Sequence, residues 1–356
     1  MGQTLVIGDL EAKIPVIQGG MGVGISLSRL AGTVAANGGI GIISTAQIGW
    51  REPDFAKNPF EANFRAIKKE ILKAKEIAGK GIVGVNIMVA TQRYEEYVRA
   101  AAQAGADVII SGAGLPVDLP KYVEGTDTKI APIVSSLKSC TVICRMWERK
   151  YKRYPDFVVI EGPKAGGHLG FSLEELETFT EESYDEVIKS IIEKVKEYEA
   201  KAGRKIPVIV AGGIFDGEDM KHAMELGADG VQVGTRFVTT EECDAAPEYK
   251  EAYLKAKKGD IGIVKSPVGM PGRAIYNTFI EKTKTEKCRI KHCYQCIVTC
   301  KPKEIPYCIT QALVNAAEGN TEEALLFCGE NAYKCNKIET VKEVMEDFKN
   351  CLTMDR

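Results

Sequence analysis

One stretch decides the fold of this chain: IPVIVAGGIFDGEDMKHAMELGADGVQVGTRF, residues 206–237. It contains two short apolar runs that enclose an amphipathic segment. The runs are continuously apolar rather than alternating, which is typical of parallel strands that are covered by helices on both faces. Each run ends in glycine, the first at Gly212 and Gly213 and the second at Gly234. The stretch therefore predicts a strand–helix–strand unit with a glycine turn after each strand.

The same unit recurs along the chain. Eight apolar runs of this kind occupy residues 14–18, 39–44, 81–88, 106–112, 129–135, 157–162, 206–213 and 229–235. Amphipathic segments that predict helices lie between them at residues 27–37, 58–79, 94–104, 141–151, 184–202 and 218–226. Eight such steps indicate an α/β protein with a closed (β/α)8 TIM barrel. An open doubly wound sheet is the alternative, but its Gly-x-Gly-x-x-Gly turn is missing after the first strand.

Composition narrows the class of protein. Hydrophobic residues make up 45% of the 356 residues and charged residues 27%, which is ordinary globular usage. The net charge of −2 provides no basic surface for nucleic acid. The sequence shows no secretory signal and no run of about 18 apolar residues that could span a membrane. We therefore expect a soluble, cytoplasmic protein that binds neither nucleic acid nor membranes.

The repeating pattern of apolar runs and amphipathic segments stops near residue 240. We predict two domains, a barrel at residues 1–240 and a C-terminal extension at residues 241–356 that packs on it. The extension is expected to be a mainly helical, cysteine-rich cap, with helices at residues 247–257, 306–318 and 338–352. Residues 164–184 form a long acidic connection that is either a lid over the site or the start of the next helix.

Eight of the eleven cysteines follow residue 280, and five of them are closely spaced: Cys288, Cys293, Cys296, Cys300 and Cys308. Their spacing partly matches iron–sulfur ligand patterns, and it also suits zinc bound by thiolates with help from His292. A third interpretation is simple packing, since Cys293, Cys296 and Cys300 have the spacing of a buried helix face. We favour packing and assign no metal, and the two metal alternatives stay open.

The carboxyl ends of barrel strands meet at one mouth, where active sites of such barrels lie. The residues expected there are Gly20, Met21, Gly22, Asn86, Glu161, His168, Gly212, Gly213, Gly234 and Thr235. Half of them are glycines, which let backbone amides approach a ligand closely. The turns after strands seven and eight are the usual phosphate site of these barrels. The sequence therefore predicts phosphate binding beside a single histidine.

Six motifs carry a resemblance to a known family: PVIQGGMG (15–22), GVNIM (84–88), EGPKAGGHLGF (161–171), AGGIFDG (211–217), GADGVQVGTRF (227–237) and SPVGMPGRAI (266–275). Together they resemble the nitronate monooxygenases, formerly called 2-nitropropane dioxygenases. The FMN-dependent enoyl-acyl-carrier-protein reductases are the sister group. The resemblance covers about residues 14 to 280. One departure concerns Gly19 and Gly20, which stand where the family commonly has Ala-Pro, and it leaves the substrate open.

The resemblance implies a bound FMN. Its phosphate would lie at Gly212, Gly213, Gly234 and Thr235, and its ring and ribityl chain would contact Gly20, Met21, Gly22, Asn86 and Glu161. His168 would face the substrate as the catalytic residue, with Gly166 and Gly167 keeping Cβ atoms away from the flavin. An imidazole with an ordinary pKa near 6.5 can act either as a neutral base or as a cation that binds an anionic substrate.

The implied activity is that of an FMN-dependent oxidoreductase that converts alkyl nitronates or nitroalkanes to a carbonyl compound and nitrite with O2. The alternative is an NAD(P)H-dependent enoyl-thioester reductase on the same FMN barrel. A third hypothesis, from another class, is a redox-sensing thiol protein that uses the barrel as a scaffold. The sequence does not decide whether NAD(P)H is a partner or whether the chain forms a homodimer.

Overall fold

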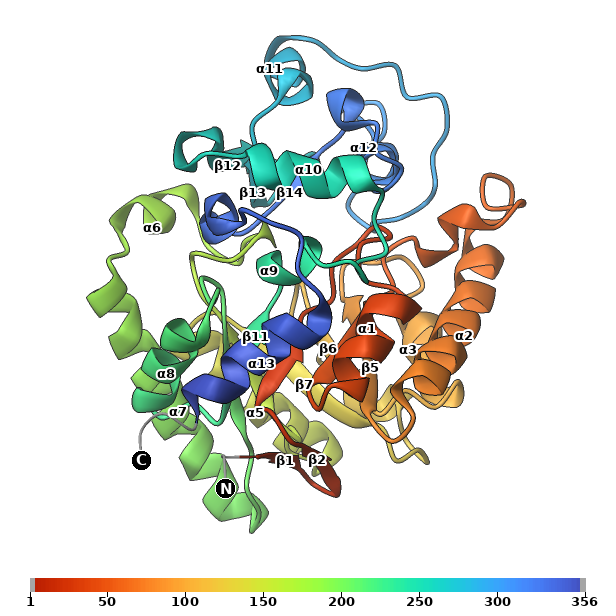
Figure 1. Cartoon of the computed structure of the whole chain (residues 1–356). Coiled ribbons are helices and arrows are strands. Elements are labelled where there is room, and N and C mark those ends of the chain that lie inside the picture. Colours follow the sequence, from red (N-terminus) through yellow and green to blue (C-terminus); the bar gives the residue numbers. More distant parts are fainter. Residues whose placement is uncertain (1–3, 353–356) are drawn as a thin grey trace.

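The computed structural model describes residues 4–352 and contains a closed barrel of eight parallel strands (Figure 1). The strands are β3 (Val16–Gln18), β4 (Ile40–Ser44), β5 (Ile82–Met88), β6 (Val108–Gly112), β7 (Lys129–Val134), β8 (Val158–Glu161), β10 (Val208–Ala211) and β11 (Gly230–Val233). Strand β11 pairs with β3 and so closes the ring. The eight predicted strands and the TIM-barrel fold are confirmed.

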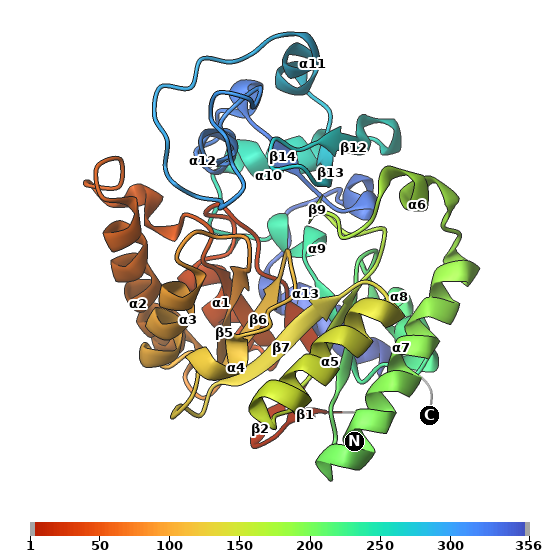
Figure 2. The same ribbon diagram turned by 180° about the vertical axis from the view of Figure 1, so that it is seen from behind.

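Helices cover the outside of the barrel, as Figure 2 shows from behind. Their bounds are α1 (Ser28–Ala36), α2 (Pro59–Ala78), α3 (Tyr94–Gln103), α4 (Leu119–Tyr122), α5 (Leu137–Tyr151), α6 (Leu173–Thr178), α7 (Glu181–Ala202) and α8 (Gly217–Glu225). Helices α5 and α7 begin before the predicted residues. In each case the side chain of the preceding residue, Ser136 or Thr180, accepts a hydrogen bond from the third backbone amide of the helix.

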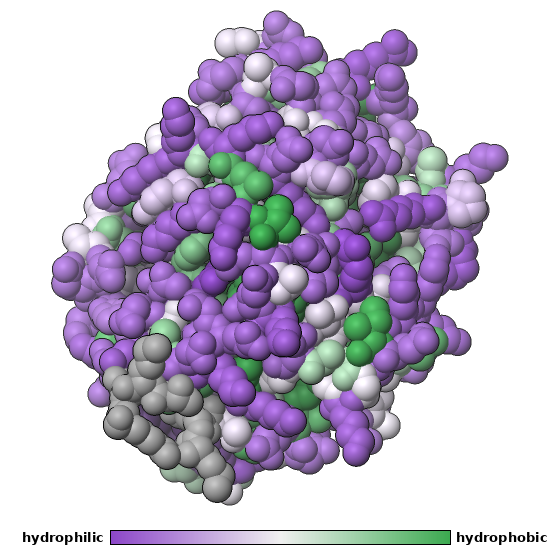
Figure 3. All heavy atoms as spheres, in the orientation of Figure 1, coloured by the Kyte–Doolittle hydropathy of each residue, from purple (hydrophilic) through white to green (hydrophobic). Residues whose placement is uncertain are grey.

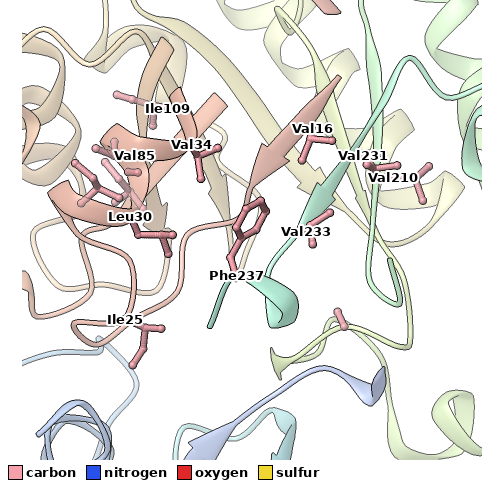
Figure 4. Close-up of a cluster of buried hydrophobic side chains, with 14 of the residues drawn as sticks. Val16, Ile25, Leu30, Val34, Val85, Ile109, Val210, Val231, Val233 and Phe237 are labelled. Atoms are coloured by element: carbon pink, nitrogen blue, oxygen red, sulfur yellow. The ribbon is translucent and has the colours of Figure 1, made fainter. Parts of the chain in front are cut away.

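Two layers of apolar side chains hold the barrel together. The outer layer lies between strands and helices, and Figure 4 shows Leu30 and Val34 of α1 beside strand residues such as Val85. The inner layer fills the barrel and includes Ile17, Ile42 and Val159. A hairpin of β1 (Leu5–Ile7) and β2 (Leu10–Ala12) adds buried side chains to the inner layer. The filled interior leaves ligand space only at the mouth.

The cap lies over one end of the barrel in both ribbon views (Figures 1 and 2). It contains α10 (Pro247–Lys255), β12 (Ile261–Lys265), β13 (Pro271–Ile275), α11 (Thr278–Thr285), α12 (Ile309–Ala317) and β14 (Leu326–Phe327). Strand β13 is central to an antiparallel sheet, with β12 and β14 as partners. The turn-rich motif SPVGMPGRAI thus includes strand β13. The cap therefore contains a small sheet, which the prediction of a mainly helical cap did not include.

The helical interpretation of the cysteine stretch is wrong. Between α11 and α12 the chain has no helix, and Cys293, Cys296 and Cys300 therefore do not form a helix face. Helix α12 begins only at Ile309, three residues later than predicted. Local spacing was misleading here, because the segment follows the surface of the barrel and cap: Val298 donates a backbone hydrogen bond to Ala90 of the barrel at 2.9 Å.

The last helix, α13 (Val341–Cys351), returns to the barrel and packs against α1 and α8 (Figure 1). Arg236, in the short helix α9 (Thr235–Val238), reaches α13 and the segment just before it. Its guanidinium pairs with Asp347 at 2.6 Å and with Glu339 at 3.1 Å. The boundary between two domains at residue 240 stays a prediction. Helix α13 belongs to the C-terminal extension in sequence, but it joins the ring of helices around the barrel.

The surface in Figure 3 is mostly hydrophilic, with small and scattered hydrophobic areas. Within residues 4–352, none of the helices combines the length and the apolar character that a membrane span requires.

Candidate active site

A cavity of about 430 Å³ lies between the barrel mouth and the cap. Its size falls within the range of roughly 300–1,000 Å³ that is common for small-molecule sites. The cavity brings together every site residue expected from the sequence: Gly20, Met21, Gly22, Asn86, Glu161, Gly166, Gly167, His168, Gly212, Gly213, Gly234 and Thr235. Residues far apart in the chain therefore share one binding space, and their individual roles stay predictions.

The glycines at the mouth are required by the backbone and by close packing. Gly212 and Gly213 have φ values of +90° and +94°, a region that other residues rarely adopt. A Cβ atom on Gly20 would lie 2.5 Å from the Cβ of Asn86, so glycine there leaves room for the Asn86 side chain. Larger residues at these three positions would strain the turns or displace Asn86.

One end of the cavity offers uncapped helix amides. The N-terminus of α8 is capped, because Asp216 accepts a hydrogen bond from the backbone of Asp219. In contrast, α9 follows Gly234 directly and has no side-chain cap. A short extra helix after strand eight is the usual phosphate position in such barrels. The cap closes this end, since Gly329 donates its backbone N–H to Oγ1 of Thr235 at 3.0 Å.

His168 sits where the barrel and the cap join. The two-residue strand β9 (Gly167–His168) pairs with β13 of the cap. Nε2 of His168 lies 2.7 Å from Oγ of Ser266, and its ring meets the edge of Phe327 at 5.0 Å between centroids. Burial lowers the pKa of His168 to about 4. The imidazole is therefore neutral at pH 7, which favours a base over a cationic anion binder.

Glu161 is a second ionisable group on the cavity wall, at the end of β8. Burial raises the pKa of its carboxyl group to about 7. Its backbone carbonyl accepts a hydrogen bond from the hydroxyl of Tyr184 at 2.9 Å, which ties the end of the strand to α7. The charge of the cavity thus changes near neutral pH through Glu161 rather than through His168.

The structure shows that glycine is required at position 166 for a different reason from the one expected from the sequence. A Cβ atom on Gly166 would lie 2.5 Å from the backbone carbon of Cys328 and 2.6 Å from the nitrogen of Gly329. Glycine is therefore needed so that the cap backbone can approach the loop. At Gly167 no atom lies within 4 Å of the Cβ position, but its φ of +73° favours glycine.

The sequence patterns do not reveal the cavity walls that the cap provides. Cap residues that line the cavity include Val268, Met270, Cys296, Thr310 and Phe327. Ser266, which contacts His168, lies in the motif SPVGMPGRAI and could have been found there. No local signal marks Thr310 or Phe327. They reach the cavity only because the cap folds back over the barrel mouth.

Comparisons with known proteins identify the family of this chain. The family model described as nitronate monooxygenase matches residues 3–350. A probable nitronate monooxygenase from Staphylococcus saprophyticus is 26% identical over 309 residues, covering 78% of this chain and 80% of that protein. A similar protein from Staphylococcus aureus is 24% identical over 294 residues and covers 77% of this chain and 78% of its own length.

Solved structures agree as well. FabK from Thermotoga maritima is 25% identical with a TM-score of 0.71, covering 96% of this chain and 93% of that one. A nitroalkane oxidase from Streptomyces ansochromogenes has the same fold, with a TM-score of 0.71, 17% identity and 96% coverage of both chains. Because the family model spans nearly the whole chain, this protein belongs to the nitronate monooxygenase family and is an oxidoreductase of that family.

Proposed function

We propose that this protein is an FMN-dependent nitronate monooxygenase that oxidises alkyl nitronates or nitroalkanes to a carbonyl compound and nitrite with O2. The observation that carries the proposal is the shared cavity: a neutral, half-buried His168 and the glycine turns after β10 and β11 line one space. Family membership supports the same activity.

The residues of the cavity fit FMN. The uncapped first turn of α9 and the left-handed turn at Gly212 and Gly213 suit a phosphate group, because backbone amides at such places bind anions. Toward the other strand ends, Gly20, Gly22 and Asn86 line the same cavity, where the flat ring would lie. Bound FMN would supply the redox chemistry, taking electrons from the substrate and passing them to O2.

His168 performs the proton transfer in this proposal. Its low pKa keeps the imidazole neutral at pH 7, so that a lone pair is available for the α-proton of a neutral nitroalkane, and it also makes the imidazole a weaker base than one with an ordinary pKa. The contact between Nε2 of His168 and Oγ of Ser266 holds the ring orientation. When Nε2 donates in this contact, the lone pair of Nδ1 remains available as the base. A preformed nitronate has already lost this proton and does not need the base.

Substitution His168→Asn tests this role. We expect turnover of a neutral nitroalkane to fall by about 10²–10⁴-fold, the usual contribution of a general base, while turnover of the preformed nitronate changes much less. Initial rates of nitrite release with both substrate forms give the comparison. Equal losses on both forms would contradict proton abstraction by His168.

A second candidate is an NAD(P)H-dependent enoyl-thioester reductase, and the similarity to FabK over 96% of this chain favours it. Anaerobic mixing with NADPH separates the two activities. Rapid loss of the flavin absorption with NADPH, and none with ethylnitronate, would favour the reductase. The opposite pattern is expected for the monooxygenase.

A further inference from the structure

The wall of the cavity carries few ionisable side chains of the acidic and basic types. Within residues 4–352, the lining contains only three residues that are Asp, Glu, Lys, Arg or His, namely Glu161, Lys164 and His168. The buried His168 has a pKa of about 4 and is neutral at pH 7, and Glu161 is neutral or negative there. Lys164 is therefore the one positive side chain among these lining residues.

Lys164 lies at the end of the cavity where the phosphate group is expected. Strand β10 pairs with both β8 and β11, so the turns that follow these three strands adjoin. A Cβ atom on Gly213 would lie 3.1 Å from both Cβ and Cδ of Lys164, so the lysine stem crosses the left-handed turn after β10. A Cβ atom on Gly329 would lie 2.6 Å from Oγ1 of Thr235 and 3.6 Å from the carbonyl oxygen of Lys164. Lys164 is thus close to two residues of the expected phosphate site.

The present partner of Lys164 is an exposed carboxylate. Its Nζ donates to Oε2 of Glu181 at 2.9 Å, and the two side chains are 39% and 61% exposed. Exposed pairs of this kind contribute little stability, so the flexible lysine can change partners at small cost. Glu181 stands in the first turn of α7, where the helix dipole favours a carboxylate even without the lysine.

The other charges that act on Lys164 are acidic. Burial lowers the pKa of Lys164, but the hydrogen bond and charge of Glu181, with the charges of Glu330 and Asp219, outweigh burial and raise it above the ordinary value. The ammonium group is therefore positive at pH 7. Lys334 is a second cation in the neighbourhood, since its charge acts on Glu181. Without Lys164, a phosphate group at this end of the cavity would face mainly negative side chains.

We propose that Lys164 binds the phosphate group of FMN and leaves Glu181 when the cofactor enters. This inference rests on the proposed function, because it takes FMN as the ligand of the cavity. A phosphate group carries more negative charge than a carboxylate at pH 7 and offers more acceptor oxygens, so it competes well for the ammonium group. Lys164 then supplies the charge, and the backbone at Gly212 and Gly213 supplies the shape of the phosphate site.

The test compares two flavins that differ only in the phosphate group. The full chain, freed of bound flavin, is titrated with FMN and with riboflavin, and the loss of flavin fluorescence gives both Kd values. We expect Lys164→Met to raise the Kd for FMN by about 10-fold, the low end for hydrogen bonds to charged groups, and to leave the Kd for riboflavin unchanged. Lys164→Arg should keep the preference for FMN, and Glu181→Gln should strengthen FMN binding because it frees the lysine.

Lys189→Met is the matched control, since Lys189 also pairs with a glutamate, Glu186 at 2.7 Å, but lies on α7 outside the cavity wall. It should bind both flavins as the wild type does. An unchanged Kd for FMN in Lys164→Met, or equal losses for FMN and riboflavin, would overturn the role of Lys164 while FMN binding by the wild type still supports the proposed function. A wild type that binds neither flavin would overturn both.

Discussion

At the scale of single residues, burial shifts the pKa values of two cavity side chains in opposite directions. Burial lowers the pKa of His168 to about 4 and raises that of Glu161 to about 7, so both groups favour their neutral forms at pH 6. The sequence identified both residues from their places after β8. It could not give their pKa values, because burial is set by the cap. Ser266 stands in the quoted motif SPVGMPGRAI, but its contact with His168 is created by the fold.

Ser266→Ala tests the positioning role of the serine hydroxyl. Removing the 2.7 Å contact to His168 should lower kcat for a neutral nitroalkane by about 3–10-fold, which corresponds to one hydrogen bond of roughly 0.5–1.5 kcal/mol. The KM should change little, and Ser266→Thr should restore activity because it keeps the hydroxyl. Steady-state kinetics of the three proteins give the result. An unaltered kcat in the alanine variant would remove Ser266 from the account.

Glu161 predicts a pH dependence. Above pH 7 its carboxylate is negative and repels an anionic nitronate, so the KM for nitronate should rise as the pH rises through about 7. Glu161→Gln should abolish this rise. Initial rates with preformed nitronate between pH 6 and 8.5 provide the measurement, and a pH profile that is identical in both proteins would speak against the assignment.

The raised pKa of Glu161 also affects the stability of the folded protein. The pKa of Glu161 is raised above its ordinary value of 4.5, so the folded protein holds a proton that the unfolded chain releases. Its contribution is therefore most favourable at low pH and is lost as the pH rises toward about 7. Glu161→Gln should make the free energy of unfolding less dependent on pH in this window.

At the scale of elements, the barrel strands and the helices α10, α12 and α13 were predictable, and the small sheet of the cap was not. Continuous apolar runs such as residues 206–210 appear only where a strand is buried on both faces, so the pattern and the structure agree. In the cap, strand β13 contains Pro271 and Gly272, which are typical of a turn, and its pairing with β12, β14 and β9 makes it a strand. The cysteine stretch has helical spacing without a helix. Tertiary contacts determine the backbone conformation of both segments.

Gly166→Ala tests the contact between the loop after β8 and the cap. The new Cβ atom would lie 2.5 Å from the backbone of Cys328, which must move. We expect a loss of about 1–3 kcal/mol in the free energy of unfolding, typical of overpacking, and weaker FMN binding. Gly259→Ala is the control, since no atom lies within 4 Å of its Cβ position. Equal melting temperatures for the two variants would contradict the tight contact.

At the scale of the whole molecule, the chain leaves the barrel after β11, forms the cap and returns as α13. The exit and the return lie side by side, because Thr240 and Glu339 form a β-bridge. The cap is thus connected to the barrel at both of its ends. This topology explains why cap residues can complete the cavity wall. Sequence patterns alone suggested a terminal appendage, since they carry no information on where α13 packs.

Arg236→Met tests the return of α13. The buried guanidinium pairs with Glu339 and Asp347, and its removal leaves the partly buried carboxylate of Glu339 with the 3.5 Å contact to Lys337. We expect a loss of about 3 kcal/mol in the free energy of unfolding, as for other broken buried pairs. Urea unfolding of the wild type, Arg236→Met and the charge-conserving Arg236→Lys measures it. A methionine variant as stable as the wild type would show that α13 is held by apolar packing alone.

The central claim is that the cavity binds FMN and presents it to a nitronate. The most direct measurement is the absorption spectrum of the purified chain after addition of FMN and removal of the excess, followed by anaerobic addition of ethylnitronate. The account predicts one bound FMN per chain and loss of the flavin absorption on addition of ethylnitronate. A chain that retains no FMN, or bound FMN whose absorption ethylnitronate leaves unchanged, would contradict it.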